Sequence, residues 1–442
     1  MVTRMVVGGL LAIGLFTASG AGAQEVPAAP NGNGTASAAA AAPQSGAVAT
    51  VVDAGADGFG IRSADGSFRL RFNGVAQYDG RVFARDEAES LVNGFEIRRL
   101  RADLRGTVYG SYDFRVNVDY AGNRVEVLDA YLEGRFARAF QVRAGKFKPP
   151  VGLERLQSVS TLFFTERAFP TALVPSRDVG VQVQGDVLGG TLNYAVGVFN
   201  GAADGAVGEG DTSDSKDLAG RLFLRPFAGS EVPALSGLAF GVAGTIGEQH
   251  GTTSVPGVPA LRSTIGRTTF LRLRGDGTAG GTVLLEGRRT RVSPQASWYW
   301  GSLGAIGEYV RSTSEVRLGG EPRELKNRAW QLTGSWVLTG EAASDRNVDP
   351  ARPFDPSEGG WGAFQLAGRI QRIETDAGTF PFLADPNVSA QGATGYTIGL
   401  NWYLNRFVKI QSDYELTRLR AAEGGVAADD EHVFATRIQV SF

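Results

Sequence analysis

The chain ends with the sequence EHVFATRIQVSF, residues 431–442, in which apolar and polar side chains alternate. Phe434 and Ile438 have the same parity as the terminal Phe442, whereas Arg437 has the opposite parity. Because successive side chains of a strand point to opposite faces, this pattern predicts a β-strand with one apolar and one polar face.

The same alternation recurs along the chain. From Phe68 to Tyr78 the even positions are mostly apolar, while the odd positions include Arg69, Arg71 and Gln77. Helical spacing does not fit this window or the similar ones. We predict sixteen strands, at residues 67–83, 94–110, 111–121, 125–136, 139–148, 178–187, 190–200, 216–227, 236–247, 282–300, 303–317, 327–340, 360–374, 392–404, 406–420 and 430–442. A further strand-like piece at 268–275 is assigned to a long outer loop, because single-chain bacterial barrels have an even number of strands.

The N-terminus has the features of an export signal. Arg4 precedes an apolar stretch at residues 6–18, and Ala21 and Ala23 flank a glycine before Gln24. This predicts a signal peptide at residues 1–23, cleaved near Ala23. Residues 24–58 are mainly Ala, Pro, Gly, Asn and Ser, which predicts a flexible periplasmic leader. Residues 59–442 are predicted to form one β-barrel.

Alternation also occurs in soluble β-sandwiches, so the pattern alone does not place the chain in a membrane. Segments of about 10 residues, charges on the polar face and Tyr or Trp near strand ends favour a membrane barrel. We therefore expect an all-β protein, a 16-stranded antiparallel transmembrane β-barrel in contact with lipid in the Gram-negative outer membrane. The terminal Phe442 is typical of barrels that the assembly machinery reads at their C-terminus. Sixteen strands leave an aqueous channel.

The alternation changes phase in the second predicted strand. Phe95 and Ile97 are at odd positions, whereas Leu100 and Leu104 are at even ones. A β-bulge near residues 98–99 would produce this change. Alternatively, residues 95–97 lie outside the apolar band.

A long segment without strand pattern follows the fifth predicted strand. Pro149 and Pro150 end that strand, because proline offers no N–H to a neighbour, and the next strand begins at Asp178. The segment is rich in apolar residues, so it must pack against something. We expect this third outer loop to fold inward and narrow the channel.

Arginines gather on the predicted lumen face and on this loop. Guanidinium groups stay charged at any working pH and match the oxygens of phosphate and carboxylate. The candidate anion-binding residues are Arg98, Arg99, Arg101, Arg105, Arg155, Arg167 and Arg177. The alternative for each one is pairing with a carboxylate on the same wet face, such as Asp103, Asp119 or Asp129. The net charge of -2 gives no reason to expect nucleic acid as a partner.

Four stretches together resemble a known family. The sequence FEIRRLRADL at 95–104 resembles the Arg-rich second strand of the phosphate-selective porins of types O and P. GKFKPPVGLE at 145–154 is similar to the entry of their third loop, and FTER at 164–167 with RDVGVQ at 177–182 to its later part. RPF at 352–354 and GGWGAF at 359–364 resemble a late turn and strand.

The resemblance implies a trimeric porin that conducts small anions, phosphate or polyphosphate among them. It implies that Arg98, Arg99 and Arg101 line the constriction, with Arg155 on the loop. Members of the family that bind phosphate tightly use loop lysines, and this chain has none between Lys148 and Lys216. A general or organic-solute porin without phosphate selectivity is therefore the alternative.

An outer-membrane enzyme is the rival from another class. The chain has no cysteine, and its two histidines are His250 and His432. A Ser-His triad or a zinc site needs imidazole or thiolate groups close to one another. We expect no catalytic residues, no metal and no cofactor.

Overall fold

A computed structural model describes residues 50–55, 58–84, 91–208, 214–426 and 429–442. All of these belong to one unit, Val48–Phe442. The predicted signal peptide and residues 24–49 of the predicted leader lie outside the described residues.

The described residues form strands joined by turns and a few short helices. The strands are β1 (Thr50–Gly55), β2 (Gly58–Ser63), β3 (Arg69–Ala84), β4 (Gly94–Val108), β5 (Tyr112–Asp119), β6 (Glu126–Ala137), β7 (Phe140–Phe147), β8 (Asp178–Val187), β9 (Leu192–Phe199), β10 (Asp217–Leu224), β11 (Ala239–His250), β12 (Leu261–Arg262), β13 (Thr269–Leu271), β14 (Leu284–Trp300), β15 (Leu303–Leu318), β16 (Glu321–Val337), β17 (Ala363–Thr375), β18 (Ala390–Tyr403), β19 (Val408–Ala421) and β20 (Glu431–Ser441). The α-helices are α1 (Leu153–Leu156) and α2 (Pro233–Ser236), and the 3-10 helices are η1 (Phe169–Leu173), η2 (Leu188–Gly190), η3 (Pro356–Glu358) and η4 (Ala377–Thr379). Among the described residues, the helices are too short or too polar to cross a bilayer.

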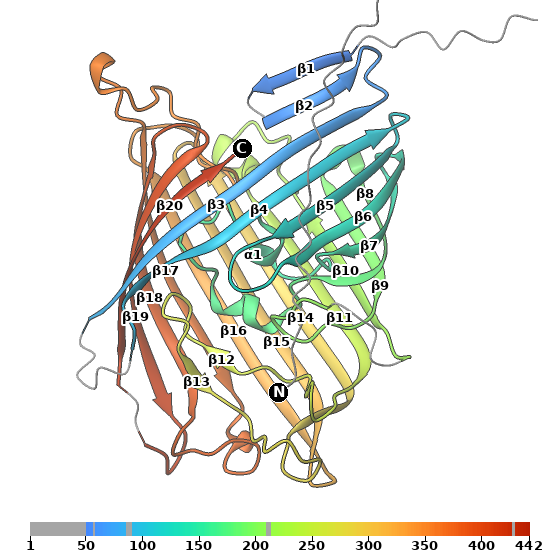
Figure 1. Ribbon diagram of the computed structural model, residues 1–442, viewed down its shortest axis with the longest axis vertical. Helices are drawn as coiled ribbons and strands as arrows, with labels where there is room; N and C mark the ends of the chain where they lie inside the picture. The colour runs from blue at the N-terminus through green and yellow to red at the C-terminus, as the bar shows by residue number, and fades with distance from the viewer. Residues whose placement is uncertain (1–49, 56–57, 85–90, 209–213, 427–428) are drawn as a thin grey trace, which may run out of the picture. The chain divides into compact units, whose positions relative to one another are not determined.

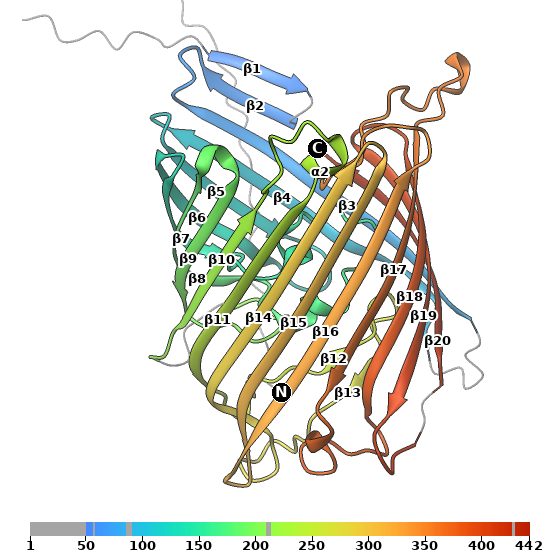
Figure 2. The same ribbon diagram turned by 180° about the vertical axis from the view of Figure 1, so that it is seen from behind.

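Sixteen of these strands, β3–β11 and β14–β20, form a closed antiparallel barrel (Figures 1 and 2). Each pairs with its neighbours in chain order, and β20 pairs with β3 from Ser441↔Val75 to His432↔Ala84, which closes the ring. The prediction of sixteen strands is confirmed. The piece predicted at 268–275 contains β13, which pairs with β12 in a separate two-stranded sheet that is not part of the barrel wall.

The barrel wall is polar inside and apolar outside. On β20, Arg437 and Gln439 are fully buried, whereas Phe434 and Ile438 are each 48% exposed. In a soluble protein the apolar residues would be the covered ones. The inversion follows from the two-residue period, since the face toward lipid must be apolar and the lumen is wet.

A hairpin of β1 and β2 extends the wall beside the C-terminus. β2 pairs with residues 69–72 of β3, the part of β3 that β20 leaves unpaired. The ring of Phe442 lies 5.5 Å from the ring of Phe59 and covers the backbone of Gly74. Strand β1 falls within the predicted leader. Its composition did not suggest a strand, because pairing to β2 rather than burial of large side chains orders it.

The phase change in β4 is a β-bulge. Gln77 of β3 pairs with Arg99, and the next residue, Tyr78, pairs with Ile97, so Arg98 has no partner across the ladder. The extra residue turns Arg98 toward the same side as Arg99, and both side chains reach one carboxylate, that of Glu166.

Candidate functional site

The segment of residues 148–177 lies against the polar inner side of the wall from β15 to β20. The backbone N–H of Leu153 donates to the carboxylate of Glu308 on β15 at 2.7 Å. The N–H of Phe169 donates to Oε1 of Gln371 on β17 at 2.9 Å. Apolar side chains of the segment join the wall in one cluster, which includes Leu153, Phe163, Phe164, Ile306 and Ala367. The segment is therefore held to inward-facing residues of these strands.

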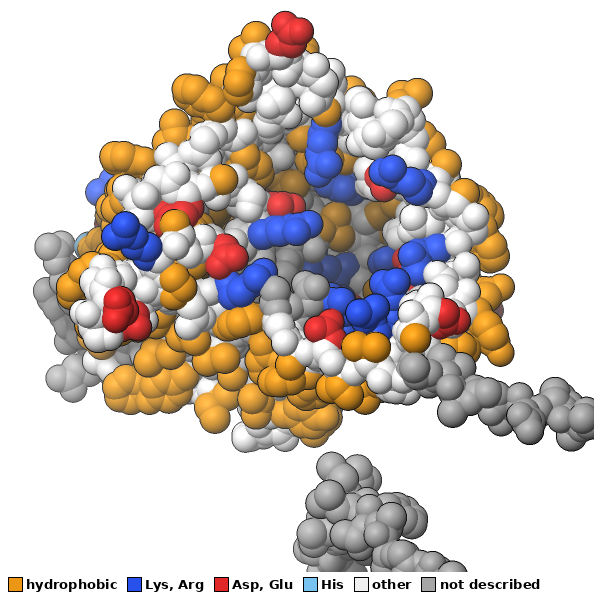
Figure 3. Space-filling view, turned by 90° about the horizontal axis from the view of Figure 1, so that it is seen from above, with side chains coloured by type: hydrophobic (Ala, Val, Ile, Leu, Met, Phe, Trp, Pro, Cys, Tyr) orange, Lys and Arg blue, Asp and Glu red, His pale blue; other side chains and the backbone are white. Residues whose placement is uncertain are grey.

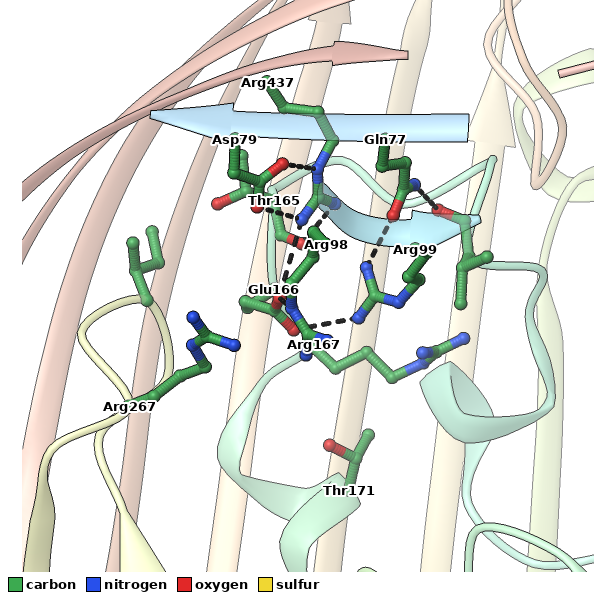
Figure 4. A network of polar contacts seen from close by, with 12 residues as sticks. Gln77, Asp79, Arg98, Arg99, Thr165, Glu166, Arg167, Thr171, Arg267 and Arg437 are labelled. Carbon is green, nitrogen blue, oxygen red and sulfur yellow. Dashed lines mark hydrogen bonds and ion pairs between the residues drawn. The ribbon is translucent and has the colours of Figure 1, made fainter. Parts of the chain in front are cut away.

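The bulge in β4 brings two arginines to this segment (Figure 4). Nε of Arg98 donates to Glu166 at 2.6 Å, and Nη2 of Arg99 donates to the other carboxylate oxygen at 3.1 Å. Nη1 of Arg99 also donates to Gln77 at 2.7 Å. Without the extra residue, adjacent side chains would point to opposite faces.

A third arginine ties the segment to the closing strand. Arg437 donates to both carboxylate oxygens of Asp79, at 2.6 and 2.7 Å, and to the carbonyl oxygen of Thr165 at 2.5 Å. Its Nη2 lies 3.5 Å from Glu166. We call Asp79, Arg98, Arg99, Glu166 and Arg437 the Glu166 hub. Burial alone would raise the pKa of Glu166, but the three arginines hold it well below its ordinary value.

Two predicted residues of the segment bind its own backbone. Arg155 donates to the carbonyl oxygen of Thr171, and Arg167 donates to those of Glu154 and Gln157 at 3.0 and 2.8 Å. Burial lowers the pKa of Arg155 to about 10 and that of Arg167 to about 9, so both are charged at neutral pH. These contacts fold the segment on itself.

Of the remaining predicted residues, Arg101 and Arg105 lie on β4, and Arg177 is the last residue of the segment, directly before β8. Arg101 pairs with Asp119 at 2.7 Å, Arg105 with Asp103 at 2.6 Å, and Arg177 with Asp129 at 3.3 Å. The Arg105 side chain is 53% exposed, whereas those of Arg101 and Arg177 are nearly covered.

A cavity of about 470 Å³, which we call the vestibule, opens at the end of the barrel that holds Phe442. Viewed from that end, basic side chains surround a hollow (Figure 3). Its lining has eight basic residues and two acidic ones, Asp103 and Asp349. The basic residues are Arg71, Arg101, Arg105, Arg115, Lys148, Arg177, Arg346 and Arg406. The surplus of positive charge makes this space attractive to anions.

The sequence prediction selected three of those eight, Arg101, Arg105 and Arg177. Arg71 and Arg115 have the same strand parity as the predicted residues and could have been selected on that basis. Arg346 and Arg406 lie in turns, where alternation gives no signal. Among the described residues, no group of three or more His, Asp or Glu side chains could hold a metal ion.

The chain resembles known proteins over nearly its whole length. The family profile described as "Phosphate-selective porin O and P" matches residues 68–442. Porin O of Pseudomonas aeruginosa is 24% identical over 439 residues, covering 89% of this chain and 94% of that protein.

Solved structures share the fold at low identity. The outer membrane channel DcaP of Acinetobacter baumannii superposes with a TM-score of 0.53 at 10% identity, over 86% of this chain and 99% of that one. An anion-selective porin from Comamonas acidovorans superposes with a TM-score of 0.51 at 12% identity, over 85% of this chain and 100% of that one. OmpT of Vibrio cholerae, solved in a trimer form, superposes with a TM-score of 0.50 at 10% identity, over 85% of this chain and 100% of that one.

Proposed function

Because this chain belongs to the family of phosphate-selective porins O and P and forms a closed barrel, it is a channel protein of the Gram-negative outer membrane, and we propose that small anions diffuse passively through its lumen. The family and the fold point to a channel rather than to an enzyme. His432, one of the two histidines, shares a 2.7 Å hydrogen bond with the hydroxyl of Tyr414. Its position in β20 has the same outward-facing parity as Phe434.

The observation that carries the proposal is the charge of the vestibule. Eight basic side chains and two acidic side chains line one water-accessible cavity. A lumen lined mostly by one sign of charge raises the local concentration of the opposite ion and repels the like ion. Phosphate is among the anions we propose, since the planar guanidinium fork matches its oxygens.

We propose that the 148–177 segment forms the constriction, as an inward-folded third loop. Its hydrogen bonds to Glu308, Gln371 and Arg437 support this placement, because all three are buried residues of the barrel wall. Arg98, Arg99, Arg155 and Arg167 would then hold the segment in place. Arg101, Arg105 and Arg177 would line the vestibule, where Arg105, the most exposed of the three, would face the passing anions.

We also propose that the channel is a homotrimer. Strands β5, β7, β9 and β10 have eight residues each, whereas β14–β16 have 16 or 17. Eight residues tilted by about 45° cover roughly 19 Å, less than the apolar band of about 25 Å. A neighbouring copy of the chain, packed against these short strands, would cover the part of the barrel wall that is too short to span the lipid. Cross-linking in detergent, followed by mass measurement, tests this.

Two proposals concern export and assembly. Residues 1–23 would be removed near Ala23 after secretion, and residues 24–49 would continue as a leader. The barrel-assembly machinery would recognise Phe442. Mass spectrometry of the mature protein and the outer-membrane yield of a Phe442→Ala variant test them.

The channel proposal is tested with purified protein in a planar bilayer under a KCl gradient. We expect the reversal potential to have the sign of chloride preference, and added phosphate to reduce the chloride current. Potassium preference would overturn the proposal. A chloride current that is unchanged by added phosphate would show that phosphate is not among the anions that bind in the channel.

A further inference from the structure

A second, smaller cavity lies beside the vestibule, on the inner side of β6–β10. It has a volume of about 220 Å³ and shares Arg115, Lys148 and Leu156 with the vestibule. We call it the side cavity. Its lining combines cations with aromatic rings, notably Tyr131 and Phe147.

The rings of the side cavity lie against guanidinium groups. Arg143 stacks over the ring of Tyr131 at 4.4 Å and lies 5.4 Å from the ring centre of Phe147. Glu133 holds Arg143 in this position through a 2.6 Å ion pair. Ring and guanidinium faces offer a ligand stacking surface that an inorganic anion cannot use.

Arg221 supplies a further guanidinium group to the lining of the cavity. Its guanidinium lies 4.3 Å over the ring of Phe223, and Nε donates to Gln295 at 3.1 Å. Within the part of the chain that the structure describes, Arg221 makes no ion pair. Most of its donors therefore remain available to a carboxylate or phosphate.

Lys148 supplies a second basic group without a carboxylate partner among the described residues, and burial lowers its pKa well below its ordinary value. Its Nζ donates to the carbonyl oxygens of Leu156 and Gln157 at 3.1 and 2.7 Å. The one carboxylate in the lining, Asp129, is already paired with Arg177 at 3.3 Å and Arg115 at 3.7 Å. Amide side chains complete the lining at Gln182, Gln184 and Asn193. The cavity thus combines basic groups with aromatic ring faces.

We propose that the side cavity binds small organic anions in which a carboxylate is attached to an aromatic ring. The carboxylate pairs with Arg221, and the ring stacks against the Tyr131–Arg143 pair. Such solutes bind transiently in the side cavity, whereas inorganic anions pass through the vestibule. The inference rests on the proposed anion channel and names a solute class for one part of its lumen.

The test measures block of the chloride current by benzoate, with acetate as the matched anion that lacks a ring. We expect benzoate to halve the current at a concentration several-fold lower than acetate does. Arg221→Gln should weaken block by benzoate about tenfold, as expected for loss of a charge-assisted hydrogen bond. Tyr131→Leu should bring benzoate close to acetate and leave block by acetate unchanged.

Arg406→Gln is the matched control, because it removes the same charge from the vestibule, and block by benzoate should stay within twofold. Urea unfolding in lipid vesicles reports whether each variant is folded, and block is expressed as the fraction of that variant's own chloride current. Equal block by benzoate and acetate in the unmodified channel would overturn the inference, even if Arg221→Gln failed to fold. Undiminished block in a folded Arg221→Gln channel would also overturn it. A potassium-selective channel would instead overturn the proposed function.

Discussion

Two groups of arginines in one lumen differ in what surrounds them. In the Glu166 hub, Arg99 and Arg437 are buried and bonded to carboxylates from other parts of the chain. In the vestibule, Arg105 and Arg406 are about half exposed and pair with Asp103 and Asp349 beside water. Removing one partner of a buried ion pair lowers the free energy of unfolding strongly, because the other charge is left uncompensated. Exposed pairs are screened by solvent and contribute little to that free energy. We propose that the first group stabilises the structure and that the second attracts ions.

The largest effect is expected when the hub loses its central carboxylate. Glu166→Gln leaves Arg98, Arg99 and Arg437 short of negative charge, and we expect a loss of about 3–5 kcal/mol in the free energy of unfolding. Urea unfolding in lipid vesicles measures this. Glu324→Gln removes a carboxylate from an exposed pair with Lys326 and should cost less than about 1 kcal/mol. Equal losses in the two variants would remove the distinction between the groups.

A double-mutant cycle measures how strongly Asp79 and Arg437 interact in the hub. Asp79→Asn leaves Arg437 with an uncompensated charge, and Arg437→Gln does the same to Asp79. Each single variant should lose about 3 kcal/mol, and the double variant should lose less than the sum of the two. Additive losses would mean that the two side chains do not interact as the 2.6 and 2.7 Å contacts indicate.

The hub also predicts a pH dependence. The pKa of Glu166 is well below its ordinary value of 4.5 in the folded protein, so its contribution to stability is complete above about pH 5. It is lost as the pH falls through the lowered folded-state pKa. Stability measured from pH 7 downward should therefore fall less steeply in Glu166→Gln than in the unmodified protein. Parallel curves would contradict the assignment.

The smallest effect on stability is expected in the vestibule. Arg406 lies 3.8 Å from Asp349, and both side chains are largely exposed. Arg406→Gln should change the free energy of unfolding by no more than about 0.5 kcal/mol, while chloride conductance falls. A loss as large as that in the hub would place Arg406 among the structural arginines.

The sequence predicted the barrel because the period of two is a local property of each strand. It also located the phase change in β4, although it left the bulge as one of two explanations. It could not predict that Glu166 meets Arg437, since that contact joins residues 271 positions apart. Strand parity placed arginines in the lumen without showing which have a carboxylate within reach. That information lies in the path of the 148–177 segment and in the register between strands.

We propose that the ion selectivity of the channel comes from the water-facing arginines. The most direct measurement compares reversal potentials of the unmodified channel and of an Arg105→Glu, Arg406→Glu variant in the same KCl gradient. We expect chloride preference in the unmodified channel and a shift toward potassium in the variant, with the free energy of unfolding nearly unchanged. Potassium preference in the unmodified channel, or identical reversal potentials in the two proteins, would contradict the claim.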